Sequence, residues 1–283
     1  MEKVERINDL NQISFPNLGF DFFIDPVAFT VFGVEIKWYG ILITLGVLIA
    51  ILYCYPKMKK FGLDSDRATD AVLGGIFGSI VGARAYYVIF NLPYYLNHPD
   101  QIIAVWNGGL AIHGGLIAGV FTMWAGCRYY HIRFWQLADI LAPLMILGQA
   151  IGRWGNFMNG EAFGSEATNF LRMGIFNYNS YVTFDKLEMV YVHPTFLYES
   201  LWNLTGVLLV YLFAKFIGKK YDGQLILLTF GWYGLGRMFI EGLRTDSLYI
   251  PGTELRTSQV LAAAIFVVCL GLLIYFFIKK WKK

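Results

Sequence analysis

The chain of 283 residues is 57% hydrophobic and 18% aromatic, whereas only 15% of its residues are charged and its formal net charge is +3. Because a soluble domain carries about 25% charged residues, this composition excludes an ordinary soluble protein and predicts a polytopic membrane protein. Cys54, Cys127 and Cys269 lie in or next to apolar segments, with no CxxC pair and no His cluster nearby. We therefore expect inert buried thiols, with no disulfide and no metal site.

The first 37 residues differ from the rest of the chain. They begin with alternating charges and contain no compact apolar stretch before Trp38, so they do not resemble a cleavable signal peptide. We interpret residues 1–37 as an extracytoplasmic arm, rich in aromatic residues, at the membrane surface. No internal repeat or linker follows, so residues 38–283 are expected to form one transmembrane domain.

Apolar segments long enough to approach a membrane span recur through that domain. A span needs about 20 mainly apolar residues. Seven candidates are residues 38–55, 71–90, 110–127, 137–151, 195–217, 224–240 and 258–278. The fourth and sixth are short or polar at one end. The pattern predicts an all-α fold of seven transmembrane helices.

The distribution of positive charge predicts the orientation of these helices. The loops after the first, third and fifth spans, together with the C-terminal tail, hold thirteen of the 23 Lys and Arg residues, whereas residues 91–109 hold none. Positively charged loops stay in the cytoplasm. We therefore expect the N-terminus outside and the C-terminus in the cytoplasm.

On this map, six of the spans direct polar side chains toward their outer ends. These side chains are Tyr39, Arg84, His113, Arg153, His193, Tyr198, Glu199, Arg237 and Glu241. Ionisable residues within a membrane are costly and mark functional sites by default, and the cytoplasmic half has no comparable set. The sequence therefore predicts a polar site in the outer leaflet.

The densest part of this layer is the stretch GRWGNFMNGEAFG, residues 152–164. It holds Arg153, Asn156, Asn159 and Glu161 at the end of an apolar segment. Such groups require polar partners or a polar ligand beside hydrocarbon. We expect the four glycines of the stretch to turn the backbone sharply and to let it approach a ligand.

Other members of the layer have structural alternatives. Three glycines repeat every fourth residue before Arg84 and predict close helix packing. Arg84 is either an anion ligand or a structural partner of Glu199 or Glu161. His113, flanked by glycines, is either a hydrogen-bonded core residue or a general base.

A second set of charges follows a helical spacing. Arg237, Glu241 and Arg244 lie at i, i+4 and i+7 in GRMFIEGLRTD, which indicates either an internal ion-pair ladder or a carboxylate that orients a functional arginine. His193 precedes a Pro at the expected start of a helix, which favours a structural role.

Several chemistries lack their motifs. The sequence contains no GxSxG, HExxH, P-loop or dinucleotide fingerprint. The polar layer has no well-placed Ser or Cys nucleophile, so the nucleophile of any reaction would arrive with a substrate. Its arginines and amides suit an anionic headgroup.

At these residues the chain resembles a known family. GRWGNFMNGEAFG is similar to the signature GRxGNFxNxExxG of the bacterial prolipoprotein diacylglyceryl transferases, with every fixed position met. WYG, GARAYYV, AIHGGL, HPTFLYES and YGLGRMFIEGLR resemble the other blocks of the family in the same order. The resemblance covers about residues 38–246. The arm and the insert at residues 169–191 match no block.

The resemblance implies an enzyme of the bacterial cytoplasmic (inner) membrane. It would transfer the diacylglyceryl group of phosphatidylglycerol to the lipobox cysteine thiol of a preprolipoprotein signal peptide, leaving a thioether and glycerol phosphate. Its partners would be these two substrates and membrane lipid, with no nucleic acid, and no metal or other cofactor is implied.

Site roles follow as expectations from the resemblance and the polar layer. Phosphatidylglycerol would be bound by Arg153, Asn156, Asn159, Glu161, Gly164 and Arg84, with Arg153 on the phosphate. Arg237, supported by Glu241, would hold the leaving phosphate. His113 would take the thiol proton with Tyr39 as its hydrogen-bonding partner.

Two other classes also fit intramembrane arginines. A lipid or anion transporter would need polar groups in both leaflets, which the bare cytoplasmic half disfavours. A lipid-binding scaffold would have the same pocket without turnover. Identification of a diacylglyceryl thioether separates an enzyme from both.

Overall fold

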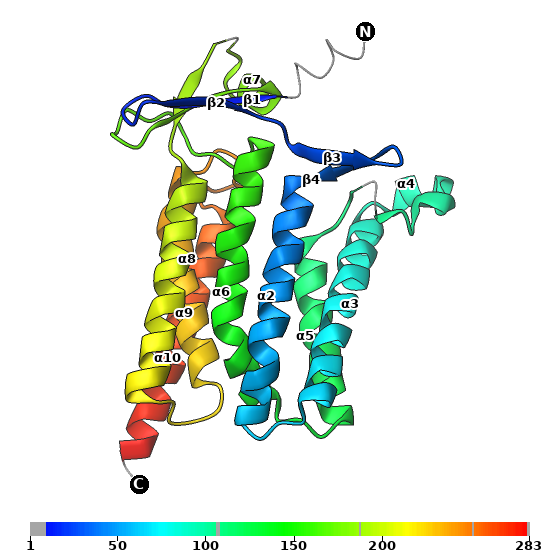
Figure 1. Cartoon of the computed structure of the whole chain (residues 1–283), viewed down its shortest axis with the longest axis vertical. Coiled ribbons are helices and arrows are strands. Elements are labelled where there is room, and N and C mark those ends of the chain that lie inside the picture. Colours follow the sequence, from blue (N-terminus) through cyan, green and yellow to red (C-terminus); the bar gives the residue numbers. More distant parts are fainter. Residues whose placement is uncertain (1–9, 106–107, 187, 251, 282–283) are drawn as a thin grey trace. The chain divides into compact units, whose positions relative to one another are not determined.

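The computed structural model describes residues 10–105, 108–186, 188–250 and 252–281, so the start of the predicted arm (residues 1–9) and Lys282 and Lys283 of the tail lie outside it. A helix occupies each of the seven predicted apolar segments (Figure 1). These helices are α2 (Trp38–Lys60), α3 (Ser65–Phe90), α5 (Ile112–Tyr129), α6 (Phe134–Asn159), α8 (Thr195–Leu212), α9 (Gln224–Ile240) and α10 (Thr257–Trp281). Shorter helical pieces are α4 (Leu92–Asn97), η1 (Pro99–Gln101), α7 (Tyr178–Phe184), the π-helical η3 (Phe213–Ile217) and η4 (Glu241–Leu243).

Within the described residues, five helices are long and apolar enough to cross a membrane. They are α2, α3, α6, α8 continued through η3 to Ile217, and α10. α5 and α9 form at the predicted positions but have only 18 and 17 residues. The chain is therefore a polytopic membrane protein.

The chain divides into two compact units. One unit comprises residues 1–50 and 141–283, and the other comprises residues 51–140. We call them the terminal unit and the central unit. α2 and α6 each contribute to both, because the divisions fall inside these helices.

In the central unit, α3 and α5 pack closely through small residues. A Cβ atom at Gly82 would lie 2.2 Å from the Cβ of Ala118, and one at Gly78 would lie 2.2 Å from Oγ1 of Thr122. Only a hydrogen fits at these positions, which confirms the predicted stripe for both glycines. Gly74 has no atom near its Cβ position. Gly75 faces α5 instead, with Cβ of Met123 at 3.0 Å.

In the terminal unit, α8 and α9 are joined by a reciprocal pair of tryptophans. Trp202 Nε1 donates to the carbonyl of Trp232 at 3.0 Å, and Trp232 Nε1 donates to the carbonyl of Trp202 at 2.8 Å. Their rings stack at 4.4 Å. Gly206 and Gly236 make room for these rings, since a Cβ on either would overlap an indole. These contacts fix the position of α8 along the axis of α9.

The arm and the insert form β-structure, so the all-helical expectation holds for the apolar segments but not for these two. A four-stranded antiparallel sheet has the order β2-β1-β5-β6, and β3 and β4 form a separate hairpin. The strands are β1 (Asn11–Phe15), β2 (Phe20–Ile24), β3 (Val27–Val31), β4 (Val34–Lys37), β5 (Met173–Phe176) and β6 (Val190–Val192). β1 pairs with β5, with Ile13 opposite Ile175. The two segments that match no family block are therefore partners.

One face of the four-stranded sheet packs on the helices of the terminal unit. Ile13, Ile175 and Val192 are fully buried against Phe157 of α6 and Phe196 of α8. Figure 1 shows the sheet at the end of the unit where α6 ends and α8 begins. Burial of these apolar side chains stabilises the sheet on that end, at about 25 cal/mol per Å² removed from water.

Candidate functional site: an arginine–carboxylate cluster

The site begins where α6 ends. The helix continues through Gly152 and Gly155 to Asn159, so the expected sharp turns at these two glycines are absent, and the backbone reverses at Gly160 with φ of +64°. Glycine adopts this left-handed conformation without strain. Helix α6 therefore runs about two turns beyond the C-terminal end that the apolar pattern alone predicted, and it presents the signature residues from a rigid element.

Amides from the sheet and the insert cap this turn. Asn11 Nδ2 donates to the carbonyl of Met158 at 2.8 Å, and Asn177 Nδ2 donates to the carbonyl of Gly160 at 3.0 Å. Asn177 also donates to Oδ1 of Asn11 at 2.6 Å. These bonds satisfy carbonyls that the end of a helix leaves open. The arm and the insert thus hold the signature turn in place.

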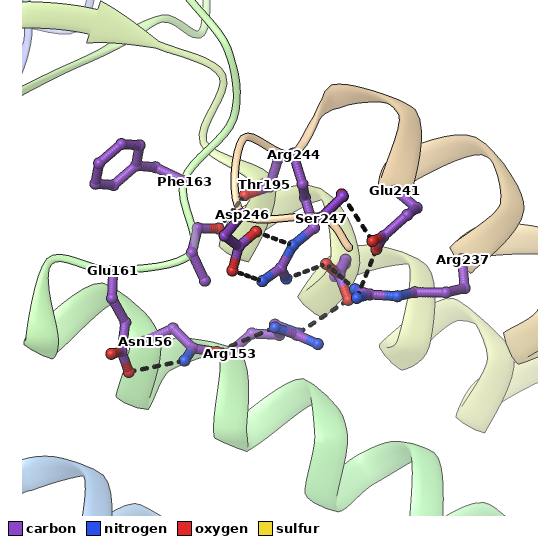
Figure 2. A network of polar contacts seen from close by, with 12 residues as sticks. Arg153, Asn156, Glu161, Phe163, Thr195, Arg237, Glu241, Arg244, Asp246 and Ser247 are labelled. Carbon is purple, nitrogen blue, oxygen red and sulfur yellow. Dashed lines mark hydrogen bonds and ion pairs between the residues drawn. The ribbon is translucent and has the colours of Figure 1, made fainter. Parts of the chain in front are cut away.

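The polar side chains of the signature bond to one another. Arg153 Nη1 donates to Asn156 Oδ1 at 3.1 Å, and the amides of Asn156 and Asn159 both donate to Oε1 of Glu161 at 3.0 Å. Figure 2 shows Arg153, Asn156 and Glu161 in sequence along this side of the site. The carboxylate therefore fixes both amides, and one amide fixes the arginine.

Glu199 on α8 is the centre of the site. Its side chain is buried, and three guanidinium groups reach it: Arg153 Nε at 2.9 Å from Oε2, Arg237 Nη1 at 2.9 Å from Oε1, and Arg244 Nη1 at 3.3 Å from Oε1. The labelled arginines point toward one another from three separate segments in Figure 2. Arg237 and Arg244 form charge-assisted hydrogen bonds with Glu199, which are the strong ones in proteins, and Arg153 forms an ion pair with it.

Two further carboxylates form ion pairs with two of these arginines. Arg237 Nη2 lies 2.6 Å from Oε2 of Glu241, and Arg244 forms a two-point pair with Asp246 at 2.9 and 2.6 Å. Ser247 donates to Oε1 of Glu241 at 2.8 Å. The cluster therefore combines three arginines with three carboxylates, so its charges balance without a ligand. The predicted pairing of Arg237 with Glu241 is present.

Arg244 and Asp246 lie in the loop between α9 and α10. Burial alone would raise the pKa of the Asp246 carboxyl, but the hydrogen bond and positive charge of Arg244 outweigh it and lower the pKa below its ordinary value. Burial opposes the charge of Arg244 as well, yet Asp246 and Glu199 raise its pKa. Both side chains are therefore ionised at neutral pH.

Gly164 forms backbone contacts with two other segments of the chain. Its N–H donates to the carbonyl of His193 at 3.0 Å, and it bridges Arg244 as an isolated β-pair. A Cβ at this position would lie 2.7 Å from Cβ of His193 and 3.0 Å from the carbonyl oxygen of Leu243. Glycine is required because three segments meet here. His193 takes part through its backbone, and its Nδ1 lies 3.3 Å from the amide of Asn169 and 3.5 Å from the hydroxyl of Tyr198, so its structural role stays a prediction.

Tyr39 lies in the first turn of α2, within the terminal unit. Its ring packs on Gly155, where a Cβ would lie 2.4 Å from Cδ2 of the tyrosine. The signature glycine thus gives Tyr39 room beside α6, two residues from Arg153 along the chain.

Arg84 and His113 belong to the central unit. Arg84 is buried and donates from Nε and both Nη atoms to four backbone carbonyls, at distances of 2.6 to 2.9 Å, and these carbonyls belong to Gln101, Ile102, Gly108 and Gly109. Its partners are thus carbonyls, whereas the structural alternative had named a carboxylate. His113 is exposed in the first turn of α5.

Glu199, Arg244 and Asp246 complete the cluster, although the sequence did not assign them to the site. Glu199 stood out as a polar residue of the outer layer and as a candidate structural partner of Arg84, and Arg244 only as a member of a helical ladder. The sequence RTD, in which an arginine and an aspartate stand two residues apart, was the available signal for the last pair.

The donor set of the cluster suits an anion. Among the described residues, no group of three or more His, Cys, Asp or Glu side chains could hold a metal ion. Each carboxylate of the cluster faces guanidinium or hydroxyl donors instead. Converging arginines bind phosphate and carboxylate groups through paired N–H bonds.

Comparisons with known proteins agree with the motifs. A family model described as prolipoprotein diacylglyceryl transferase matches residues 26–275. Three similar proteins named phosphatidylglycerol–prolipoprotein diacylglyceryl transferase come from Bacillus licheniformis, Listeria welshimeri and Staphylococcus haemolyticus, and they are 44%, 43% and 39% identical to this chain. The matches cover 89% of this chain and 92%, 90% and 88% of theirs.

Proposed function

Since the chain belongs to the prolipoprotein diacylglyceryl transferase family, we propose that it transfers the sn-1,2-diacylglyceryl group of phosphatidylglycerol to the lipobox cysteine of prolipoproteins. The products are a thioether-linked lipid on the cysteine and glycerol phosphate. This reaction is the first step of bacterial lipoprotein maturation. The observation that carries the proposal in the structure is the convergence of Arg153 and Arg237 on one buried anionic group.

The chemistry requires an anion site beside hydrocarbon. The thiolate sulfur attacks the terminal glyceryl carbon, a new C–S bond forms and the C–O bond to phosphate breaks. The bonding electrons leave on the phosphate oxygen, and the thiol proton passes to a base. Arg153 and Arg237 stabilise the phosphate as its charge increases in the transition state.

The remaining residues have the following roles in this proposal. Asn156, Asn159 and Glu161 form one side of the headgroup pocket, because their mutual bonds fix the orientation of each polar group. Glu241 holds Arg237 in position from the same helical face. Gly164 shapes the pocket through its close backbone contacts.

Tyr39 and His113 act on the acceptor. His113 is the base for the thiol, since an imidazole nitrogen can accept a proton. Tyr39 provides a hydrogen bond on the side of α6 where its ring packs on Gly155. Arg84 contributes to phosphatidylglycerol binding by fixing the backbone at residues 101–102 and 108–109 with its four carbonyl bonds.

The proposal includes a topology. The seven helices at the predicted apolar segments, α5 and α9 included, span the bacterial cytoplasmic membrane, with the N-terminal arm outside and the C-terminus in the cytoplasm. The positive charge of the odd-numbered loops supports this orientation. The arginine cluster then faces the outer leaflet, where a secreted thiol and an anionic lipid meet.

Headgroup release tests the proposal. Purified protein in vesicles that contain phosphatidylglycerol with a labelled headgroup should release glycerol phosphate only when a lipobox peptide with a free cysteine is added. The same peptide with serine in place of cysteine is the control. A scaffold or transporter would release no glycerol phosphate in either case, and that result would overturn the proposal.

A further inference from the structure

Glu199 holds the three arginines of the cluster unequally. Arg237 has a second carboxylate in Glu241, and Arg244 has one in Asp246. Among the described residues, Glu199 is the one carboxylate paired with Arg153, whose other bond goes to the neutral amide of Asn156. Arg153 therefore depends on Glu199 for its charge balance.

Arg153 is also the most accessible of the three. Its side chain is 20% exposed, whereas those of Arg237 and Arg244 are 14% and 8% exposed and that of Glu199 is 5% exposed. A ligand that enters the cluster thus meets Arg153 first. Since a guanidinium beside hydrocarbon requires polar acceptors, Arg153 can leave Glu199 where the oxygens of another anion replace the carboxylate.

The carboxylate of Glu199 presents its two oxygens to two different arginines. Oε2 faces Arg153 and Oε1 faces Arg237. The two non-bridging oxygens of a phosphodiester have a similar fork, and they carry one negative charge in total, as the carboxylate does. The carboxylate and the lipid phosphate therefore compete for the same donors.

We propose that Glu199 occupies, in the lipid-free protein, the place between Arg153 and Arg237 that the phosphodiester of phosphatidylglycerol takes on binding. The proposal rests on the proposed function and deepens it by naming a positioning residue of the phosphate site. Glu199 keeps both arginines ordered before the lipid arrives. When the lipid binds, the phosphate replaces Glu199 as the ion-pair partner of Arg153. The lipid binds by exchange of one anion for another, and Arg237 and Arg244 retain Glu241 and Asp246.

The exchange makes a specific prediction for Glu199→Gln. The variant keeps the shape of the side chain but removes the competing charge, so phosphatidylglycerol should reach half of its maximal rise in melting temperature at an about tenfold lower mole fraction than in the wild type, equal to about 1.4 kcal/mol. Diacylglycerol, which lacks the phosphate, should stabilise both proteins equally. A purely structural role would lower the melting temperature without changing the lipid dependence.

Ser200→Ala is the matched control. Ser200 is the next residue on α8, is equally buried and bonds Trp154 and the carbonyl of Ala150, so its loss weakens the same helix contact without changing charge. It should lower the melting temperature and leave the half-saturating lipid fraction at the wild-type value.

Glu199→Asp keeps the experiment decisive if the glutamine variant does not fold. The aspartate side chain is one methylene shorter, so its carboxylate cannot reach all three arginines. The half-saturating lipid fraction of this variant should therefore lie between those of the wild type and the glutamine variant. A half-saturating fraction at or above the wild-type value in the variant that folds would overturn the exchange. Wild-type release of glycerol phosphate tests the enzyme separately, so an active wild type with unchanged lipid dependence in the variants rejects only this inference.

Discussion

Replacement of Arg153 by lysine is the sharpest perturbation of the site. Nε of the arginine forms an ion pair with Oε2 of Glu199 at 2.9 Å, and Nη1 donates to Oδ1 of Asn156 at 3.1 Å, so two edges of the planar group are in use. Lysine keeps the charge but offers a single ammonium at the end of a flexible stem. This ammonium can pair with Glu199 or with Oδ1 of Asn156. It cannot keep such a contact and also make two parallel bonds to a phosphate.

The expected loss follows from these contacts. One hydrogen bond to a charged group is worth about 1.5–3 kcal/mol, and each 1.36 kcal/mol is a factor of ten in rate. Arg153→Lys should therefore lower kcat/KM for transfer to a lipobox peptide by about 10- to 150-fold. Arg67→Lys is the control, since Arg67 forms an exposed pair with Asp64 and its replacement should change the rate less than twofold. Full activity of Arg153→Lys would refute the two-point phosphate contact.

Three further predictions concern the surroundings of the site. Asn177→Ala should cost about 1–3 kcal/mol of stability, because it removes the buried bonds to the turn after α6, and both melting temperature and transfer rate should fall. The pKa of Asp246 is lowered by Arg244, so this pair stabilises the protein above the unfolded value of about 4 and the stabilisation is lost as the pH falls through the folded value. A melting curve recorded against pH should consequently be steeper below pH 4 for the wild type than for Asp246→Asn, and equal slopes would contradict the pairing. Gly82→Val should destabilise the central unit by about 1–3 kcal/mol through overlap with α5, whereas Gly74→Val, with open space at its Cβ, should melt within a degree or two of the wild type.

The helices of the membrane region were predictable because their signal is local. An apolar run identifies α2 or α10 without knowledge of any neighbour. The C-terminal end of α6 was not predictable, since Gly152 and Gly155 have weak helix propensity. Only the tertiary contact with Tyr39 shows why residue 155 is a glycine. The seven-span topology and its orientation stay predictions.

The strands of the arm escaped prediction for a different reason. β1 pairs with β5, which lies about 160 residues further along the chain, and no local pattern specifies a partner at that distance. Their alternation is also weak, because β2 and β3 are exposed on both faces. Aromatic residues in these strands were therefore interpreted as membrane-surface material.

The site was predictable in part. The depth of Arg153, Arg237 and Glu241 followed from their positions at helix ends, and the structure brings these three together. The position of a residue along a helix gives its depth, but it does not show toward which neighbour its side chain points. The central place of Glu199 could therefore not be inferred. The roles of Arg84 and His113 in the reaction stay predictions, because they lie in the other compact unit.

Mass spectrometry of a synthetic lipobox peptide, incubated with purified protein and phosphatidylglycerol vesicles, tests the central claim most directly. The wild type should add one diacylglyceryl mass to the cysteine sulfur, and Arg153→Ala, shown to be folded by its melting curve, should add none within the same time. Equal modification by both proteins would keep the transferase and remove the arginine cluster from its mechanism. An unmodified peptide with folded wild-type protein would contradict the account as a whole.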